Sequence, residues 1–219
     1  KATAQAISEQ VGLKHTSKIL EGTDIDSMTD EDLAEAVGKV DVFARTTPDH
    51  KLRIVTALQK KEEVVGMTGD GVNDVPALAA ANVGFAMGSG SEIAKDASDI
   101  ILLDDNFTSI VTAMREGRVI VANIRRMLFY ALSTNAGEAL TMIGSLIIGV
   151  PLPLAPVQIL WINLVTDTSL IIPLGLESAS GEIMSKKPNK PDTPILSRTT
   201  IIRMIMVAAL MSIISIIVY

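Results

Sequence analysis

The fold is decided by one stretch of the sequence, Met67-Thr68-Gly69-Asp70-Gly71-Val72-Asn73-Asp74-Val75-Pro76-Ala77-Leu78. The apolar run Val64–Met67 predicts a short buried strand, and the chain leaves that strand at a turn around Asp70. Pro76 suits the first turn of a helix, and the alanine-rich residues after it favour helix. A strand, a turn and a helix in this order are typical of a parallel α/β sheet, in which ligands bind at the carboxyl ends of the strands.

The turn carries three oxygen-bearing side chains close together, those of Asp70, Asn73 and Asp74. Glycines on both sides of Asp70 let the backbone approach a ligand, and carboxylate and amide oxygens are the ligands that Mg²⁺ prefers. An ordinary Asp/Asn/Gly turn is the competing interpretation. The continuation to Leu78 favours a site for Mg²⁺ beside a phosphate.

A second segment predicts an anion contact. The sequence turns helical at Pro48, which puts Lys51 in the first helical turn, although lysine is favoured at the opposite end of a helix. We therefore expect Lys51 to reach an anion, with a solvated surface lysine as the alternative. His50 is expected on the surface, because no second histidine or cysteine completes a metal site.

Strands and helices alternate in this first part of the chain, which predicts a parallel α/β sheet. The predicted strands are Val40–Ala44, Val64–Met67, Val83–Met87 and Ile100–Leu103. Helices are predicted over Ala2–Val11, after Thr29, from Pro48 to Gln59 and from Phe107 onward.

Composition divides the chain into two parts. The 219 residues carry a net charge of −6, which gives no reason to expect nucleic acid as a partner. Mean hydropathy is +0.38, and most of the apolar residues lie in the second part. There is no cysteine, so disulfides and thiolate metal sites are excluded. The first residue is Lys1 rather than methionine, so we expect a piece of a longer protein.

Three apolar segments in the second part are predicted to cross a membrane: 128–150, 154–176 and 201–219. Basic residues precede the first segment and follow the second, and this distribution places the Asp70 domain in the cytoplasm and the Pro151 turn outside. These basic residues are Arg115, Arg118, Arg125, Arg126, Lys186, Lys187, Lys190 and Arg198.

Each of the first two segments contains one acidic residue near its middle, Glu138 and Asp167, where an ionised side chain without a partner is costly. Asn135 precedes Glu138 by three positions, while Asn163 and Thr166 precede Asp167 by four and one. These five side chains can meet between two helices and offer oxygen ligands that suit Ca²⁺, with Na⁺ or protons as lesser options. Polar contacts between helices are the alternative, but they leave two acids without a basic partner.

The second segment also contains residues that weaken a helix, Thr166–Ser169 and Pro173. We expect this weakening to free backbone carbonyl groups as further ligands.

These motifs together resemble the carboxyl-terminal half of a P-type ATPase, and they are most similar to calcium pumps of the sarcoplasmic-reticulum kind. Thr68–Asp74 resembles the hinge motif of that family, a haloacid-dehalogenase-type Mg²⁺ site, and Pro48–Lys51 resembles its phosphate-binding lysine segment. Asn135–Glu138 and Asn163–Asp167 resemble its fifth and sixth transmembrane helices. The resemblance covers essentially all 219 residues.

The resemblance implies a fold and a domain division. Residues 1–114 are expected to form the carboxyl-terminal part of a cytoplasmic phosphorylation domain, a partial haloacid-dehalogenase-like α/β domain with a Rossmann-type parallel sheet. Residues 115–219 are expected to form a stalk and three transmembrane α-helices. The resemblance also implies an integral, multi-pass membrane protein, in the plasma membrane if the source is prokaryotic.

The resemblance further implies an ATP-driven cation pump that couples formation and hydrolysis of an aspartyl phosphate to Ca²⁺ transport. Asp70 and Asp74 are expected to bind Mg²⁺, and Lys51 and Asn73 to hold the phosphoryl group. The expected transport ligands are Asn135, Glu138, Asn163, Thr166 and Asp167. ATP is the expected substrate of the full-length protein, and the expected partners are membrane lipid, the transported cation and the missing amino-terminal half.

Two features depart from the family pattern. The phosphorylated aspartate of the family lies in an Asp-Lys-Thr-Gly-Thr run that this sequence lacks, so we expect the fragment alone to be inactive. Residues Thr168–Pro173 differ from the usual continuation of the sixth helix, which leaves Ca²⁺, Mn²⁺ and Na⁺ as candidate ions.

Two other classes of protein compete with this interpretation. A truncated membrane protein that binds or regulates without catalysis is the first alternative. A membrane-anchored phosphatase is disfavoured, because its nucleophile is absent.

Overall fold

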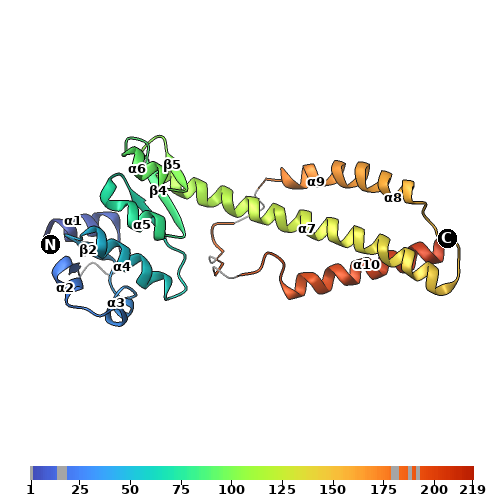
Figure 1. Cartoon of the computed structure of the whole chain (residues 1–219), viewed down its shortest axis with the longest axis horizontal. Helices are drawn as coiled ribbons and strands as arrows, with labels where there is room; N and C mark the ends of the chain where they lie inside the picture. Colours follow the sequence, from blue (N-terminus) through green and yellow to red (C-terminus); the bar gives the residue numbers. More distant parts are fainter. Residues whose placement is uncertain (1, 14–18, 179–182, 187–188, 191–192) are drawn as a thin grey trace. The chain divides into compact units, whose positions relative to one another are not determined.

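The computed structural model of the chain describes residues 2–13, 19–178, 183–186, 189–190 and 193–219. It divides into two compact units (Figure 1). Unit 1 comprises Lys1–Val111 with Pro188–Asp192, and unit 2 comprises Thr112–Lys187 with Thr193–Tyr219. Lys187, one of the basic residues expected after the second membrane segment, lies outside the described residues.

Unit 1 is an α/β domain. Its elements in chain order are α1 (Ala2–Val11), β1 (Ile19–Glu21), α2 (Gly22–Asp26), α3 (Asp30–Ala36), β2 (Val42–Ala44), α4 (Pro48–Gln59), β3 (Gly66–Gly69), the 3₁₀ turn η1 (Val72–Asp74), α5 (Val75–Ala80), β4 (Val83–Met87), α6 (Glu92–Asp96) and β5 (Ile100–Leu102). Within the described residues the strands form two parallel sheets, β1–β2 and β3–β4–β5. In register, Ile19 faces Val42, Gly66 faces Val83, and Phe85 faces Ile100. The predicted parallel α/β fold is confirmed.

Most predicted elements of unit 1 are present with small changes in their bounds. The helix Ala2–Val11 and the strand Val83–Met87 begin and end where the sequence predicts. Strand β3 begins two residues later than predicted, at Gly66. Val65, just before this strand, donates its N–H to the Asn82 side chain at 2.9 Å, and its carbonyl oxygen accepts from Val83 N at 3.2 Å.

Helix α4 lies at the centre of the apolar packing in unit 1. Ala57 of α4 packs with Ile25 and Leu33 in one buried cluster, and Val55 of α4 packs with Val65 and Ala77 in another. Burial of apolar side chains on two sides fixes the position of a helix more firmly than burial on one side. The first turn of α4, which carries Lys51, is thus attached to a packed element.

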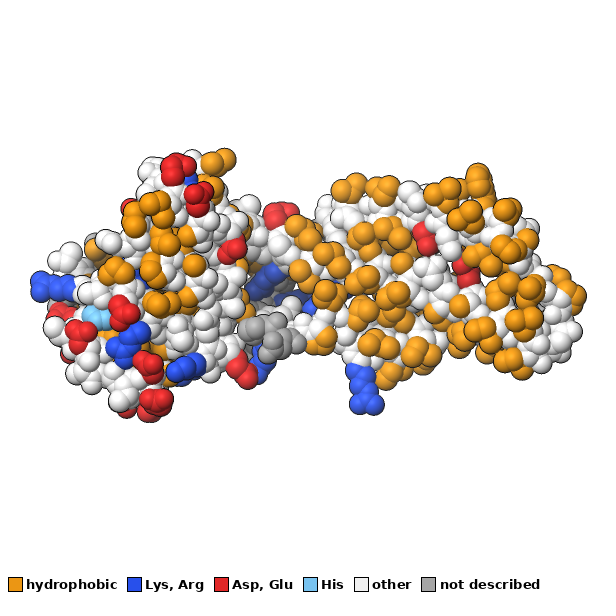
Figure 2. All heavy atoms as spheres, in the orientation of Figure 1, with side chains coloured by type: hydrophobic (Ala, Val, Ile, Leu, Met, Phe, Trp, Pro, Cys, Tyr) orange, Lys and Arg blue, Asp and Glu red, His pale blue; other side chains and the backbone are white. Residues whose placement is uncertain are grey.

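Unit 2 is helical. It contains most of α7 (Thr108–Ile148), then α8 (Pro156–Ile162), the π-helical turn η2 (Asn163–Asp167), α9 (Thr168–Gly175) and α10 (Arg198–Val218). Side chains on the face seen in Figure 2 are mostly hydrophobic over this unit. Apolar side chains such as those of Val157, Trp161 and Ile205 are exposed on this surface. A large exposed apolar surface is typical of a region that contacts a membrane or another protein.

Two helical stretches of the described residues are long and apolar enough to cross a membrane. They are Pro156–Gly175, with a mean hydropathy of 1.5, and Arg198–Val218, with a mean hydropathy of 2.6. The first predicted span, 128–150, is helical as far as Ile148, the end of α7, and is not one of these two, because polar residues such as Asn135 and Glu138 lower its hydropathy. Transmembrane helices after a partial α/β domain are confirmed as the fold class, and three spans remain a prediction.

Small side chains form the contact between α7 and α10. A methyl group added at Gly137 of α7 would lie 3.4 Å from Met211 Cβ and 3.6 Å from the carbonyl oxygen of Ala208, both on α10. Close approach of this kind is typical of helix packing in membranes. The other buried residues on the two helices in this unit include Ser133, Thr141, Ser145, Met204, Ala208 and Ser212.

The predicted weakening of the second membrane segment coincides in part with a change of helix type, while the predicted release of backbone carbonyl groups stays a prediction. The α-helical hydrogen-bond pattern ends at Ile162, continues as the π-helical turn over Asn163–Asp167, and resumes at Thr168. Pro173 lies inside α9, where it lacks a backbone N–H to donate.

Candidate functional site

The candidate site of unit 1 is built on the turn between β3 and η1. Asp74 is buried at 6% exposure. Its Oδ2 accepts from the backbone N–H groups of Asp70 at 3.4 Å and Gly71 at 3.5 Å. A methyl group at Gly69 would lie 2.4 Å from Asp74 Cβ, so only glycine allows Asp74 to lie this close to the strand.

Lys51 reaches this turn from helix α4. Its Nζ donates to Asp74 Oδ1 at 2.5 Å, and its side chain is 35% exposed. The helix begins at Pro48 after Thr47, whose hydroxyl accepts from His50 N. Lys51 is therefore not a lysine that contacts only solvent. It joins the first turn of α4 to the turn that carries Asp70 and Asp74.

The pKa of the Asp74 carboxyl reflects this environment. Burial by itself raises the pKa, while the hydrogen bond and charge of Lys51 and the N–H groups of Gly71 and Asp70 lower it. The net effect is that the pKa of Asp74 lies below the usual value for aspartate, so Asp74 is ionised at neutral pH.

Asp70 and Asn73 have exposed side chains on the same turn. The backbone of Asp70 is held by the loop after β4, since its carbonyl oxygen accepts from Ser91 N at 2.8 Å. A methyl group at Gly90 would lie 2.9 Å from that carbonyl oxygen, so the loop approaches closely because residue 90 is glycine. The backbone is therefore fixed while the Asp70 carboxylate stays accessible.

These residues fit a Mg²⁺ ion bound together with a phosphate. The contacts of the described residues give the Asp70 carboxylate no partner, and oxygen is the donor that Mg²⁺ prefers. Both oxygens of Asp74 are engaged, one by Lys51 and one by backbone N–H groups. Asp70 is thus the direct ligand that the geometry favours, and coordination by Asp74 remains a prediction.

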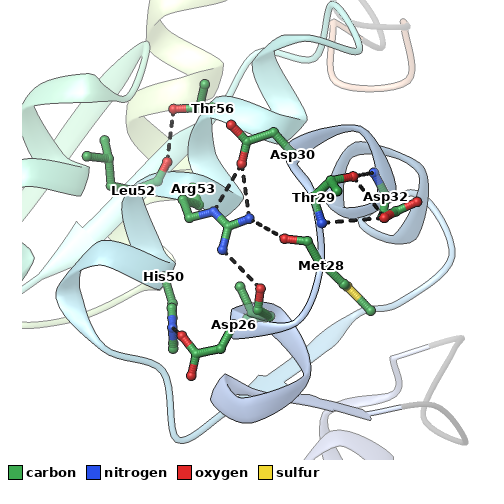
Figure 3. Close-up of polar contacts among 10 residues, drawn as sticks. Asp26, Met28, Thr29, Asp30, Asp32, His50, Leu52, Arg53 and Thr56 are labelled. Atoms are coloured by element: carbon green, nitrogen blue, oxygen red, sulfur yellow. Dashed lines mark hydrogen bonds and ion pairs between the residues drawn. The ribbon is translucent and has the colours of Figure 1, made fainter.

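The expectation that His50 lies on the surface is wrong. Its exposure is 4%, its Nε2 lies 2.7 Å from Asp26 Oδ1, and its Nδ1 accepts from Thr47 N at 3.2 Å. Figure 3 shows His50 beside Asp26, and Arg53 of the same helix beside Asp30 and Met28. The error arose because Asp26 lies in α2, a five-residue helix that was not predicted.

The candidate site of unit 2 joins α7 to the π-helical turn. The side-chain amide of Asn163 faces three acceptor oxygens, Asn135 Oδ1 at 3.2 Å and the two carboxylate oxygens of Glu138 at 3.1 and 3.2 Å. The amide nitrogen is therefore the atom assigned to that side. Three of the five predicted ion ligands thus lie together, and they come from two different helical segments.

The other two predicted ligands do not join this group through a hydrogen bond among the described residues. Thr166 is exposed and Asp167 is partly exposed on η2. No group of three or more histidine, cysteine or acidic side chains in the described part of the chain is arranged to hold a metal ion. The oxygen atoms that meet here are those of the Glu138 carboxylate and Asn135 Oδ1, and Asn163 presents its amide nitrogen to them.

Family comparisons cover both units. The family described as "Cation transporting ATPase, C-terminus" matches residues 151–219. Families described as haloacid dehalogenase-like hydrolases match residues 1–82 and 52–114.

Curated relatives match nearly the whole chain. The calcium-transporting ATPase of Bacillus subtilis (strain 168) is 44% identical over 198 residues, which is 90% of this chain and 22% of the relative. Calcium-transporting ATPase 1 of Lactococcus lactis is 44% identical over 219 residues, 97% of this chain and 25% of the relative. The probable cation-transporting ATPase F of Mycobacterium tuberculosis (strain H37Rv) is 42% identical over 95% of this chain and 24% of the relative.

The chain therefore spans about a quarter of the length of these relatives. The matches extend through the α/β unit with its Asp70 turn and through the apolar helices with Glu138 and Asn163. The chain accordingly belongs to the cation-transporting P-type ATPases.

Proposed function

We propose that this chain is part of an ATP-driven pump that forms and hydrolyses an aspartyl phosphate in order to move Ca²⁺ across a membrane. The observation that carries this proposal is the group of Asn135, Glu138 and Asn163 between two apolar helical segments. Glu138 has no salt bridge to a lysine or arginine among the described residues. A cation is the partner that compensates such an acid in a membrane.

The chemistry proposed for unit 1 is electrostatic. Lys51 Nζ binds phosphoryl oxygens and neutralises their charge, and Asp74 holds that ammonium group in place. Asp70 offers its carboxylate to Mg²⁺, and Asn73 supports the phosphoryl group with its amide. The bound Mg²⁺ supplies further charge stabilisation for phosphoryl transfer.

The aspartate that receives the phosphoryl group comes, in this proposal, from the missing amino-terminal half. Strand β3 pairs only with β4, and β1 pairs only with β2, among the described strands. A parallel strand that pairs with the open edge of β3 would end beside the Asp70 turn, because the carboxyl ends of parallel strands meet at one edge of a sheet. The missing half thus completes both the sheet and the site.

The proposed setting is the membrane of a cell with unit 1 in the cytoplasm. The relatives from Bacillus and Lactococcus are bacterial, which supports the plasma membrane. That these relatives are calcium-transporting ATPases supports Ca²⁺ as the transported ion, and Mn²⁺ or Na⁺ are the ions to test next. A non-catalytic regulatory subunit is the competing function.

The test is ATP-driven uptake of radioactive calcium into vesicles that contain the full-length protein. Glu138→Gln is expected to abolish uptake and the Ca²⁺ dependence of phosphorylation by ATP, because it removes the charge from the proposed ion site. Asp70→Asn is expected to abolish phosphorylation while Ca²⁺ binding is retained. Glu116→Gln, an exposed acid on the same helix as Glu138, is the matched control and should leave both unchanged.

Two outcomes contradict the proposal. Uptake by Glu138→Gln at the level of the unaltered protein would leave the group around Glu138 as a packing contact between helices. ATP hydrolysis by the unaltered protein that responds to Mn²⁺ or Na⁺ but not to Ca²⁺ would replace the proposed ion.

A further inference from the structure

The first two turns of α4 are held by contacts on the side that faces α2 and α3 (Figure 3). Arg53 donates to the carbonyl oxygens of Ile25 at 2.9 Å and Met28 at 2.8 Å, and its Nε donates to Asp30 Oδ1 at 3.1 Å. His50, one helical turn earlier, lies 2.7 Å from Asp26. Both side chains therefore attach α4 to one segment, residues 22–30.

The tautomer of His50 follows from its neighbours. The backbone N–H of Thr47 can only donate, so His50 Nδ1, which lies 3.2 Å away, accepts. The hydrogen of the neutral ring is therefore on Nε2, and it is donated to Asp26 Oδ1 at 2.7 Å. The Thr47 N–H and the Asp26 carboxylate together fix the tautomer and the orientation of the imidazole ring.

The ring is also confined by the backbone. A methyl group at Gly22 would lie 3.0 Å from His50 Nδ1 and 2.6 Å from the carbonyl oxygen of Arg45. His50 is buried at 4% exposure, whereas the Asp26 side chain is 67% exposed. An exposed carboxylate adds little to the stability of a fold, so Asp26 has a small part in holding the domain together.

Lys51 follows His50 directly in the chain. Successive residues of an α-helix point in directions about 100° apart, so His50 faces Asp26 while Lys51 faces Asp74, at 2.5 Å. Any rotation or displacement of the first turn moves Lys51 Nζ relative to the Asp70 turn. The contact that fixes His50 therefore fixes Lys51 as well.

We propose that Asp26 and His50 are a positioning pair that sets Lys51 in place to bind a phosphoryl group, an inference that rests on the proposed function. Neither residue touches the phosphoryl group. Asp26 holds the His50 ring by accepting a hydrogen bond from its Nε2. His50 in turn holds the start of α4 by accepting a hydrogen bond from the backbone N–H of Thr47, the N-cap residue.

The test uses the full-length protein that contains this chain and measures phosphorylation by radioactive inorganic phosphate with Mg²⁺. Asp26→Ala is expected to raise the half-saturating phosphate concentration about tenfold, since small displacements of a binding group cost one to two orders of magnitude. The maximum level of phosphorylation and the temperature of unfolding should stay close to those of the unaltered protein.

Two further variants separate positioning from stability. Asp26→Asn keeps an oxygen that accepts from His50 Nε2, so it should restore the half-saturating concentration. Glu31→Ala removes an exposed acid from the first turn of α3, and it should behave like the unaltered protein. If Asp26→Ala does not reach the membrane, Asp26→Ser takes its place.

Several results would overturn the inference. If Asp26→Ala lowers the maximum level of phosphorylation but leaves the half-saturating phosphate concentration unchanged, Asp26 has a purely structural role. Equal shifts in Asp26→Ala and Asp26→Asn would show that the acceptor oxygen is unimportant. Failure of the unaltered protein to incorporate phosphate would overturn the proposed function, and this inference with it.

Discussion

At the scale of single residues, the contact between Lys51 and Asp74 connects two segments that are separate in the sequence. The sequence predicted both residues as site residues, from a lysine at an unusual helical position and from carboxylates at the end of a strand. It did not predict that they contact each other, because a contact between residues 23 positions apart depends on how α4 packs on the sheet. His50 was missed for the same reason.

The stability that Asp74 contributes should depend on pH. Its pKa in the folded protein is lower than in the unfolded chain, where it is about 3.9. The ionised carboxylate therefore stabilises unit 1 above the unfolded pKa, and this contribution is lost as pH falls through the lower, folded pKa. Asp74→Asn should cost about 1–3 kcal/mol at pH 7, because the side chain loses its negative charge beside Lys51 and one of its two acceptor oxygens becomes an amide group that can only donate.

Thermal unfolding of the chain in detergent, followed by circular dichroism, measures this effect. The difference between Asp74→Asn and the unaltered chain should shrink below about pH 4. Asp49→Asn, an exposed position in α4, is the control. A difference that is equally large in acid would mean that the charge of Asp74 does not contribute.

At the scale of elements, long periodic segments were predictable and very short ones were not. Helix α7 began one residue after its predicted start, because its pattern repeats over many turns. Strand β1 and helix α2 have three and five residues, too few for a period to emerge. The interruption of the second membrane segment was predicted from its composition, but its π-helical form depends on backbone hydrogen bonds that no side-chain pattern specifies.

Two glycines of α7 provide a matched test of helix packing. A larger side chain at Gly137 would collide with α10, since a Cβ there already lies 3.4 Å from Met211 Cβ. Gly117, on the same helix, has no atom within 4 Å of an added Cβ. Gly137→Leu should therefore lower the unfolding temperature of unit 2 in detergent, at a cost of about 1–3 kcal/mol for overpacking.

Gly117→Leu should be neutral or slightly stabilising, because glycine in a helix interior is unfavourable by about 1 kcal/mol. Gly137→Ala should be tolerated, since 3.4 Å is an ordinary contact distance. Equal effects of leucine at the two positions would show that α7 and α10 do not pack through Gly137.

At the scale of the whole molecule, the distribution of basic residues predicts a topology that labelling can test. The chain contains no cysteine, so single cysteines can be introduced as unique reactive sites. Leu152→Cys, in the turn before α8, should react with a membrane-impermeant maleimide in intact cells. Glu63→Cys, an exposed position in unit 1, should react only after the membrane is permeabilised.

The labelling experiment uses the full-length protein with any cysteine outside this chain replaced. Reaction of Glu63→Cys in intact cells would reverse the predicted orientation. Reaction of both cysteines only after permeabilisation would mean that residues 128–150 do not cross the membrane.

The open edges of β1 and β3 have a consequence for how the protein is made. Unpaired strand edges recruit other chains, so a ribosome product that consisted of these residues alone would be prone to aggregate. If the proposed amino-terminal half supplies a strand that pairs with β1 or β3, that strand is already synthesised when β1 and β3 leave the ribosome. The order of synthesis then limits aggregation through the unpaired strand edges. Synthesis of residues 1–219 and of the preceding part as separate polypeptides would remove this protection.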